Sequence, residues 1–168
     1  FGAVLNFIGA LASTEVARTA GHPVVHAFLG EDLRNPTVAI YNHLDVQPAD
    51  PAEWSSDPFT LTIAGGRFTG RGATDDKGPA LAALTAAALA RDAGIPLNFH
   101  FLWELEEEIG SPHFASFLRE RRRGLPADSV LVSDTVWVSG RIPSIPYGLR
   151  GLLPATLSHK TARSDVHS

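Results

Sequence analysis

Four short acidic segments occur along the chain, and each directly follows an apolar run that is typical of a buried strand. They are residues 42–45, 70–78, 106–111 and 133–135. In open α/β sheets, active sites form where strands end, so side chains from these segments are expected to share one cleft. Carboxylates that share a cleft repel each other unless cations lie between them. The pattern therefore favours a sheet protein with a metal site at one end of its strands.

The apolar runs alternate with segments of helical spacing, which predicts an α/β fold with a mixed, largely parallel central sheet flanked by helices. Pro79 near a first turn and Ser111 as a cap before Pro112 are suitable helix starts. Strands are expected at 23–28, 37–42, 97–105, 129–132 and 147–157, a hairpin at 59–69, and helices at 4–20, 78–93 and 111–124.

Composition excludes several classes of protein. The chain of 168 residues contains no cysteine, so disulfides and thiolate zinc sites are excluded, and any metal must be held by His, Asp and Glu. The net charge of −4 lacks the basic character of nucleic-acid-binding domains. The basic residues between 119 and 123 close a predicted helix, where positive charge suits the helix dipole. No apolar run approaches the roughly 20 residues that span a bilayer.

The start of the chain allows two interpretations. Residues 10–12 (Ala-Leu-Ala) resemble a signal-cleavage site, but no basic segment precedes them, which favours an amphipathic core helix. The sequence also contains no methionine, so Phe1 is not expected to be a translation start. We therefore expect a piece of a longer protein.

The first two acidic segments contain candidate metal ligands. His43 and Asp45 are two positions apart, so on a strand both side chains face the same side. Taken alone, this pair fits equally a histidine that only contacts its neighbour. Asp75 and Asp76 lie between glycines, and an aspartate there could bridge two cations. A phosphate-binding loop is disfavoured because the segment lacks the G-x-x-x-x-G-K-[ST] pattern and is acidic.

The last two segments add further carboxylates. Residues 106–108 are three consecutive glutamates, which are usually a solvated charge run. Here they follow an apolar strand and precede a helix start, a corner at which active sites of α/β sheets are found. Neighbouring glutamates there could divide metal binding from proton transfer. Asp134 follows a further strand, where it could alternatively cap a turn.

Taken in order, these motifs resemble the di-zinc metallopeptidases that include carnosinase-like cytosolic dipeptidases, aminoacylases and glutamate carboxypeptidases. The resemblance runs from about Pro23 to the end of the chain. It is carried by His43-x-Asp45, Gly70-Arg71-Gly72-x-x-Asp75-Asp76-Lys77-Gly78, Glu107-Glu108-x-Gly110-Ser111 and Ser133-Asp134, together with Trp54, Asp57-Pro58-Phe59, Tyr147-Gly148-Leu149-Arg150-Gly151 and Asp165-Val166-His167-Ser168.

The resemblance implies a role for each acidic motif. His43 and Asp134 would be ligands of a first zinc ion, and Asp45 would hold the other side of the His43 ring. Asp75 would bridge the two metals, and Glu108 would bind the second. Two Zn²⁺ ions are implied for a complete site, although Mn²⁺ or Co²⁺ also suits carboxylate-rich ligands. An aspartate at 134, rather than a glutamate, points to the dipeptidase branch.

The implied reaction is metal-dependent hydrolysis of a peptide (amide) bond in dipeptides or small peptides. Glu107 would be the general base for a water that the metal activates. The peptide bond between Asp75 and Asp76 is expected to be cis, as in relatives. His167 resembles a histidine of the lid domain that reaches into the partner's active site in dimeric relatives. A cytoplasmic location and a homodimer of the full-length parent are implied too.

The resemblance also implies what this chain lacks. Residues 1–154 would be part of the catalytic domain, and 155–168 the start of the lid or dimerisation domain. The family's last histidine ligand and its substrate-binding arginine are expected beyond Ser168. Three alternatives to a dipeptidase therefore remain: a non-catalytic metal-binding fragment or assembly module, an N-acyl-amino-acid amidohydrolase or carboxypeptidase, and a metal-dependent phosphotransferase.

Overall fold

The computed structural model describes residues 12–134 and 139–159. The chain divides into two units, Phe1–Thr135 and Val136–Ser168. All the described helices and strands lie in the first unit. In the second unit, residues 139–159 contain one isolated antiparallel bridge, between Ser139 and Ile142, and neither a helix nor a strand.

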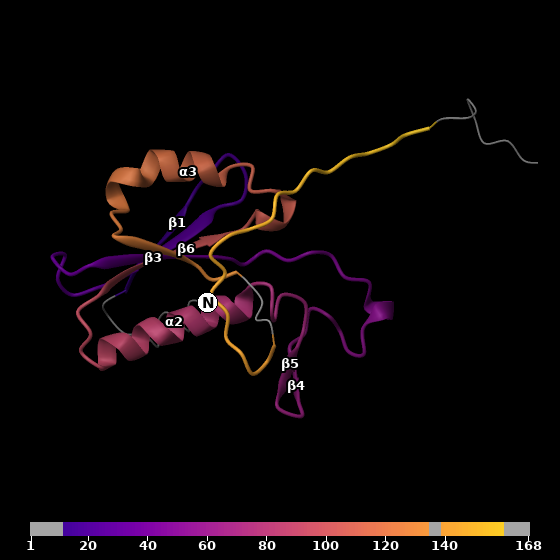
Figure 1. Ribbon diagram of the computed structural model, residues 1–168, viewed down its shortest axis with the longest axis horizontal. Helices are drawn as coiled ribbons and strands as arrows, with labels where there is room; N and C mark the ends of the chain where they lie inside the picture. The colour runs from indigo at the N-terminus through magenta and orange to yellow at the C-terminus, as the bar shows by residue number, and fades with distance from the viewer. Residues whose placement is uncertain (1–11, 135–138, 160–168) are drawn as a thin grey trace, which may run out of the picture. The chain divides into compact units, whose positions relative to one another are not determined.

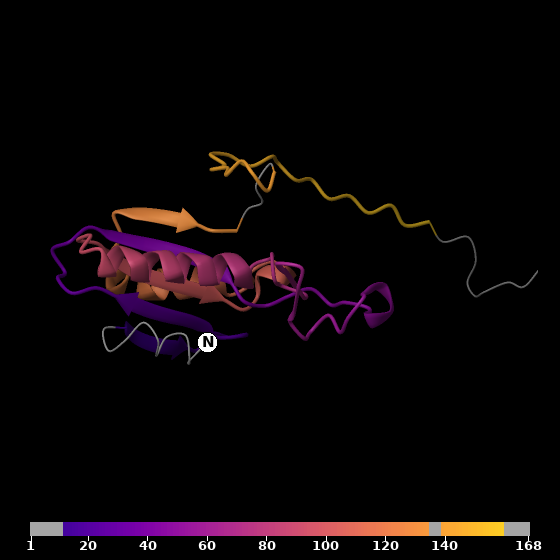
Figure 2. The ribbon, with the colours of Figure 1, turned by 90° about the horizontal axis from the view of Figure 1, so that it is seen from below.

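The central sheet has five strands in the order β1-β2-β6-β3-β7. Their bounds are β1 (Ala12–Ala17), β2 (Val24–Leu29), β3 (Thr37–His43), β6 (Asn98–Glu104) and β7 (Ser129–Val132). Strands β6, β3 and β7 run parallel to one another, whereas β1 and β2 pair in antiparallel register. Figure 2 shows β7, in orange, on one side of the sheet and the indigo β1 and β2 toward the other. The expected mixed α/β sheet is confirmed.

Two helices, α2 (Lys77–Asp92) and α3 (Phe114–Arg121), cover opposite faces of this sheet (Figure 1). Strand β6 is buried along its whole length and supplies side chains to both layers. Phe101 and Trp103 belong to the core that includes Leu84 of α2. Leu102 packs instead in the core that includes Phe117 of α3. This alternation is the period of two that a strand imposes.

The predicted hairpin and the long helix are confirmed. Strands β4 (Thr62–Ala64) and β5 (Arg67–Thr69) pair around Gly65 and Gly66, both of which have positive φ angles. Short 3₁₀ helices complete the fold: η1 (Pro51–Glu53), η2 (Glu107–Ile109) and η3 (Arg122–Gly124). None of the described helices combines the length and the apolar character that crossing a bilayer requires.

The helix predicted over 4–20 is wrong for its described part, where the chain forms β1 instead. Residues 13–16 are exposed, and the strand is held by pairing with β2, from Ala12 opposite Leu29 to Ala17 opposite Val24. Its apolar spacing therefore does not reflect burial on a helix face. Residues 4–11 lie outside the described part of the chain.

Two further local predictions are also wrong. Ser111 does not cap the third helix, because α3 begins at Phe114 and its N-cap position is occupied by His113. The strand predicted over 147–157 is absent from the structure, in which this segment has no regular secondary structure. Its large apolar side chains, such as those of Tyr147 and Leu153, are exposed.

Candidate metal centre

The acidic segments meet because the strands that precede them are parallel. Strand β3 ends at His43, β6 ends at Glu104, and β7 ends two residues before Asp134. The carboxyl ends of parallel strands lie at the same edge of a sheet, where α/β proteins place their sites. Asp75 approaches the same edge from the loop that precedes α2. The convergence expected from the sequence is therefore present.

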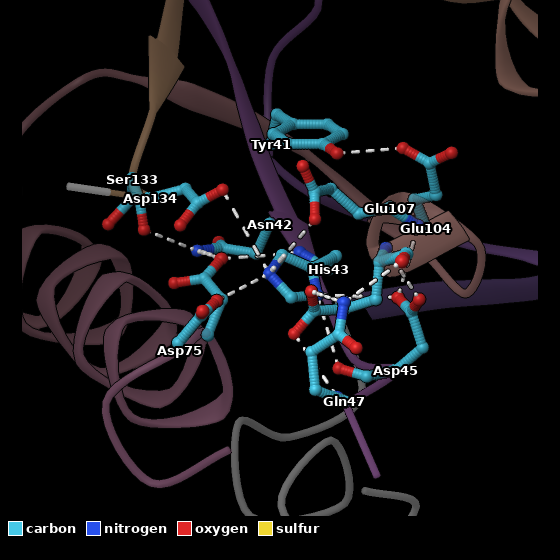
Figure 3. A network of polar contacts seen from close by, with 12 residues as sticks. Tyr41, Asn42, His43, Asp45, Gln47, Asp75, Glu104, Glu107, Ser133 and Asp134 are labelled. Carbon is cyan, nitrogen blue, oxygen red and sulfur yellow. Dashed lines mark hydrogen bonds and ion pairs between the residues drawn. The ribbon is translucent and has the colours of Figure 1, made fainter. Parts of the chain in front are cut away.

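His43 lies at the centre of this group and is completely buried. Its Nε2 atom lies 2.8 Å from Asp75 Oδ1. The same nitrogen is 3.9 Å from Asp134 Oδ2 and 3.9 Å from Glu107 Oε2. Figure 3 shows these carboxylates directed toward the imidazole from separate segments of the chain.

Asp45 contacts the opposite side of the imidazole ring. Its Oδ1 lies 3.3 Å from His43 Nδ1, and its backbone carbonyl oxygen lies 3.2 Å from the same nitrogen. The carboxylate also accepts hydrogen bonds from the backbone N–H groups of Glu107 (3.3 Å) and Glu108 (3.0 Å). Asp45 thus links the His43 ring to the segment after β6.

Negative charge is concentrated around one imidazole. Burial lowers the pKa of His43, but the hydrogen bond to Asp75 and the charges of Asp134, Asp45 and Glu107 outweigh it, so the net shift is upward. Burial raises the pKa of Glu107 and of Asp134, His43 opposes this rise, and neighbouring carboxylates add to it. A bound cation would relieve this repulsion, because opposite charge favours ionised carboxylates.

The donor set fits a divalent metal ion. Ligand atoms of His43, Asp75 and Asp134 all lie within 4.8 Å of one another. An imidazole nitrogen with carboxylate oxygens is a donor set that zinc accepts, and a carboxylate contact on the other ring nitrogen is typical of metal-binding histidines. The described residues, 12–134 and 139–159, contain one such group of three donors that could hold an ion.

Glu108 lies outside this group of donors and has other partners. Its carboxylate accepts hydrogen bonds from the Gln47 backbone N–H (3.2 Å) and from Gln47 Nε2 (2.8 Å). Gln47 Nε2 also donates to the Glu108 backbone carbonyl (3.1 Å). Both carboxylate oxygens of Glu108 therefore already accept a hydrogen bond from Gln47.

The loop that carries Asp75 has a constrained backbone. The Asp75–Asp76 peptide bond is cis, as the family resemblance implied. Gly72 has a φ of 82°, and a Cβ atom there would lie 2.5 Å from Val46 Cγ1. Glycine therefore both permits the backbone angle and lets the loop approach the segment after β3.

Asn42, Tyr41 and Glu104 lie near the site, although the sequence indicated no role for them. Asn42 is fully buried, and its Nδ2 donates to Asp76 Oδ2 (2.8 Å). Tyr41 donates to Glu104 Oε2 (2.7 Å), which raises the pKa of the tyrosine in addition to the larger effect of burial. Their position inside apolar strands could have indicated a role, because most buried polar groups have a hydrogen-bond partner. His167 lies outside the described residues.

The chain was compared with known proteins. Residues 39–150 match the sequence profile of Peptidase family M20/M25/M40. The chain belongs to this peptidase family. The match includes each acidic segment and extends to the Tyr147–Arg150 motif that the sequence singled out.

Individual relatives of this M20 chain match most of its length, but the match covers only a small part of theirs. Beta-Ala-His dipeptidase of Mus musculus is 41% identical over 151 residues, which are 87% of this chain and 31% of the relative. Cys-Gly metallodipeptidase dug1 of Schizosaccharomyces pombe is 41% identical over 152 residues, 87% of this chain and 32% of the relative. This chain therefore spans about a third of the length of these relatives.

A solved structure gives the same result. The M20 family metallo-carboxypeptidase Sso-CP2 from Sulfolobus solfataricus matches with a TM-score of 0.72 and 38% identity. The match covers 79% of this chain and 30% of that protein. The fold around the acidic segments is thus that of an M20 peptidase.

Proposed function

We propose that this chain supplies the divalent-metal site of a metallopeptidase that hydrolyses the peptide (amide) bond of dipeptides or small peptides. The observation that carries the proposal is the grouping of His43, Asp75 and Asp134 donors within 4.8 Å. The names of the dipeptidase relatives support the choice of substrate class.

His43, Asp75 and Asp134 would hold the first ion, and Zn²⁺ is the proposed metal. Mn²⁺ and Co²⁺ remain alternatives, since imidazole and carboxylate ligands accept each of them. When bound, the ion would lower the pKa of a coordinated water and polarise the scissile carbonyl group. Asp45, which contacts His43 Nδ1, would fix the ring orientation.

Glu107 would act as the general base. Its Oε2 lies 3.9 Å from His43 Nε2, beside the proposed ion, and its side chain is partly exposed, so that a water could reach it. The carboxylate would accept a proton from the attacking water and pass it to the leaving amine. Burial raises the pKa of Glu107, which makes its carboxylate a stronger base toward the attacking water.

The remaining assignments are proposals of the same kind. Asp75 and Glu108 would together hold a second ion. A role for His167, a homodimer of a longer parent protein, a cytoplasmic location and the division between 1–154 and 155–168 stay predictions. The expectation that neither nucleic acid nor a membrane is a partner also stays a prediction.

Two alternatives have specific support. A non-catalytic metal-binding fragment is favoured by the contact of Glu108 with Gln47, which leaves only a three-donor group among the described residues. A carboxypeptidase is favoured by the similarity to a metallo-carboxypeptidase, whereas the N-acyl-amino-acid amidohydrolase stays an alternative from the family resemblance alone. Peptides that differ in their N-terminal acylation and length distinguish these substrate classes.

The test is hydrolysis of β-Ala-His and Cys-Gly by the chain with added Zn²⁺. Glu107→Gln should retain the metal but lose activity by about 10²-fold or more, the usual contribution of a general base. Glu31→Gln, at an exposed glutamate outside the site, is the matched control and should be fully active. If the wild type and Glu107→Gln are equally inactive, this chain is not itself a hydrolase.

A further inference from the structure

Asn42 is a buried amide at the end of β3, one residue before His43. Its side chain is completely inaccessible to solvent. Its Nδ2 group donates two hydrogen bonds, to Asp76 Oδ2 (2.8 Å) and to the backbone carbonyl of Ser133 (2.9 Å). Both acceptors belong to segments that are distant in sequence.

These bonds join the three segments that carry the candidate metal donors. Asp76 is the neighbour of Asp75, and Ser133 is the neighbour of Asp134. The third segment is β3 itself, because the backbone N–H of His43 also donates to Asp76 Oδ2 (3.2 Å). The Asn42 amide is thus bonded to the neighbours of Asp75 and Asp134 and is itself next to His43. Figure 3 shows Asn42 and Ser133 beside the donors.

The side chains of Asn42 and His43 leave β3 on opposite faces of the strand. Side chains alternate along a strand, so Asn42 shares a face with Ile40, which packs in the core beneath α2. His43 projects from the opposite face. Any effect of Asn42 on an ion must therefore pass through the backbone and through Asp76.

We infer that Asn42 is a positioning residue for the metal site, which sets the spacing of His43, Asp75 and Asp134. The inference rests on the metal-binding part of the proposed function and does not require hydrolysis. Buried hydrogen bonds are stronger than exposed ones, and leaving a buried partner unpaired is costly, so this connection resists changes in spacing. Without it, the two loops would be free to move relative to β3.

Asn98 provides a matched control within the same sheet. It is almost completely buried at the first position of β6. Like Asn42 Nδ2, its Nδ2 donates to two acceptors, here the backbone carbonyls of Asp32 (2.9 Å) and Asn35 (3.0 Å). Position 98 pairs with Thr37 at the start of β3, whereas His43 ends that strand. Replacing Asn98 therefore removes an equivalent buried amide at the opposite end of the sheet.

The experiment compares Zn²⁺ affinity, measured by competition with a chromophoric chelator, in the wild type, Asn42→Leu and Asn98→Leu. Leucine has a similar volume but donates no hydrogen bond. Measurements are made at a temperature at which circular dichroism shows each variant to be folded. Asn42→Leu should weaken Zn²⁺ binding by about 10–100-fold, the usual effect of losing a residue that supports metal ligands. Asn98→Leu should lose thermal stability but keep the wild-type dissociation constant.

The outcomes separate this inference from the proposed function. Wild-type affinity in Asn42→Leu, or an equal loss in Asn98→Leu, overturns the positioning role and leaves the metal site intact. A wild type that binds no Zn²⁺ overturns the metal site and the positioning role together. A wild type that binds Zn²⁺ without hydrolysing peptides contradicts only the enzymatic proposal.

A second measurement on the wild type does not depend on a folded variant. In ¹H–¹⁵N spectra, the side-chain amide of Asn42 should shift when Zn²⁺ is added, because its acceptors move with the donor segments. The resonance of the Asn98 side-chain amide should not shift. Equal responses of the two amides would contradict the inference.

Discussion

His43 Nε2 and Asp75 Oδ1 lie 2.8 Å apart although the two residues are 32 positions apart in sequence. The contact joins the end of a buried strand to a loop that precedes a helix on one face of the sheet. Its partners at 3.9 Å, Asp134 and Glu107, come from two further segments. The candidate site is therefore a product of tertiary structure, and each supporting contact can be tested separately.

Asp45→Ala should weaken Zn²⁺ binding by about 10–100-fold, because it removes the carboxylate that holds the His43 ring and the backbone of Glu107 and Glu108. Chelator competition measures the effect. Asp50→Ala is the matched control, since Asp50 also accepts from a backbone N–H, that of Ala52 (2.9 Å), but does not contact the site. Equal affinities of the two variants would exclude a role for Asp45 in metal binding.

Gly72→Ala should destabilise the protein more than Gly65→Ala. Both glycines have positive φ, which costs a residue with a Cβ roughly 1–2 kcal/mol. Only at Gly72 does the added Cβ meet a neighbour, Val46 Cγ1 at 2.5 Å. Crowding there should cost a further 1–3 kcal/mol, roughly the usual range for overpacking. Urea unfolding measures the difference, and identical midpoints with unchanged slopes would contradict the account.

The paired histidines of β2 and β6 should make stability depend on pH. His26 Nε2 lies 2.9 Å from His100 Nδ1, and burial lowers the pKa of both residues. Glu15 on β1 raises the pKa of His26, whereas Arg121 of α3 lowers it, and His26 lowers that of His100. The unfolded chain therefore binds more protons than the folded chain just below the ordinary histidine pKa of about 6.5.

It follows that the stabilisation from neutral histidines is complete above about pH 6.5 and is lost as the pH falls through the lowered folded-state values. Each proton contributes at most about 1.4 kcal/mol per pH unit to this slope. Urea unfolding between pH 5 and 7.5 should show a flatter profile for the His26→Gln/His100→Gln double variant than for the wild type. Parallel profiles would show that the pair does not titrate with unfolding.

Much of the fold was predictable because local sequence and tertiary position agree. The short apolar runs that become β3 and β6 are buried, and the acidic segments follow their ends. Helix α2 begins near Pro79 and ends before Gly94, as its sequence indicates. In these elements the apolar spacing reports burial directly.

The errors arise where a distant partner decides the structure. Strand β1 exists through its pairing with β2, which its own apolar spacing does not encode. Asn42 looks like an isolated polar residue in an apolar run, because its acceptors lie 34 and 91 positions away. The contact between Gln47 and Glu108 likewise spans 61 positions, so the sequence predicted Glu108 as a ligand without this competing partner.

The metal content of the purified chain tests the central claim most directly. Elemental analysis after Zn²⁺ loading and desalting should give about one ion per wild-type chain, because the described residues form one group of three donors. His43→Ala, which removes the central imidazole, should retain markedly less. Absence of metal in the wild type, or equal metal in the wild type and His43→Ala, would contradict this account.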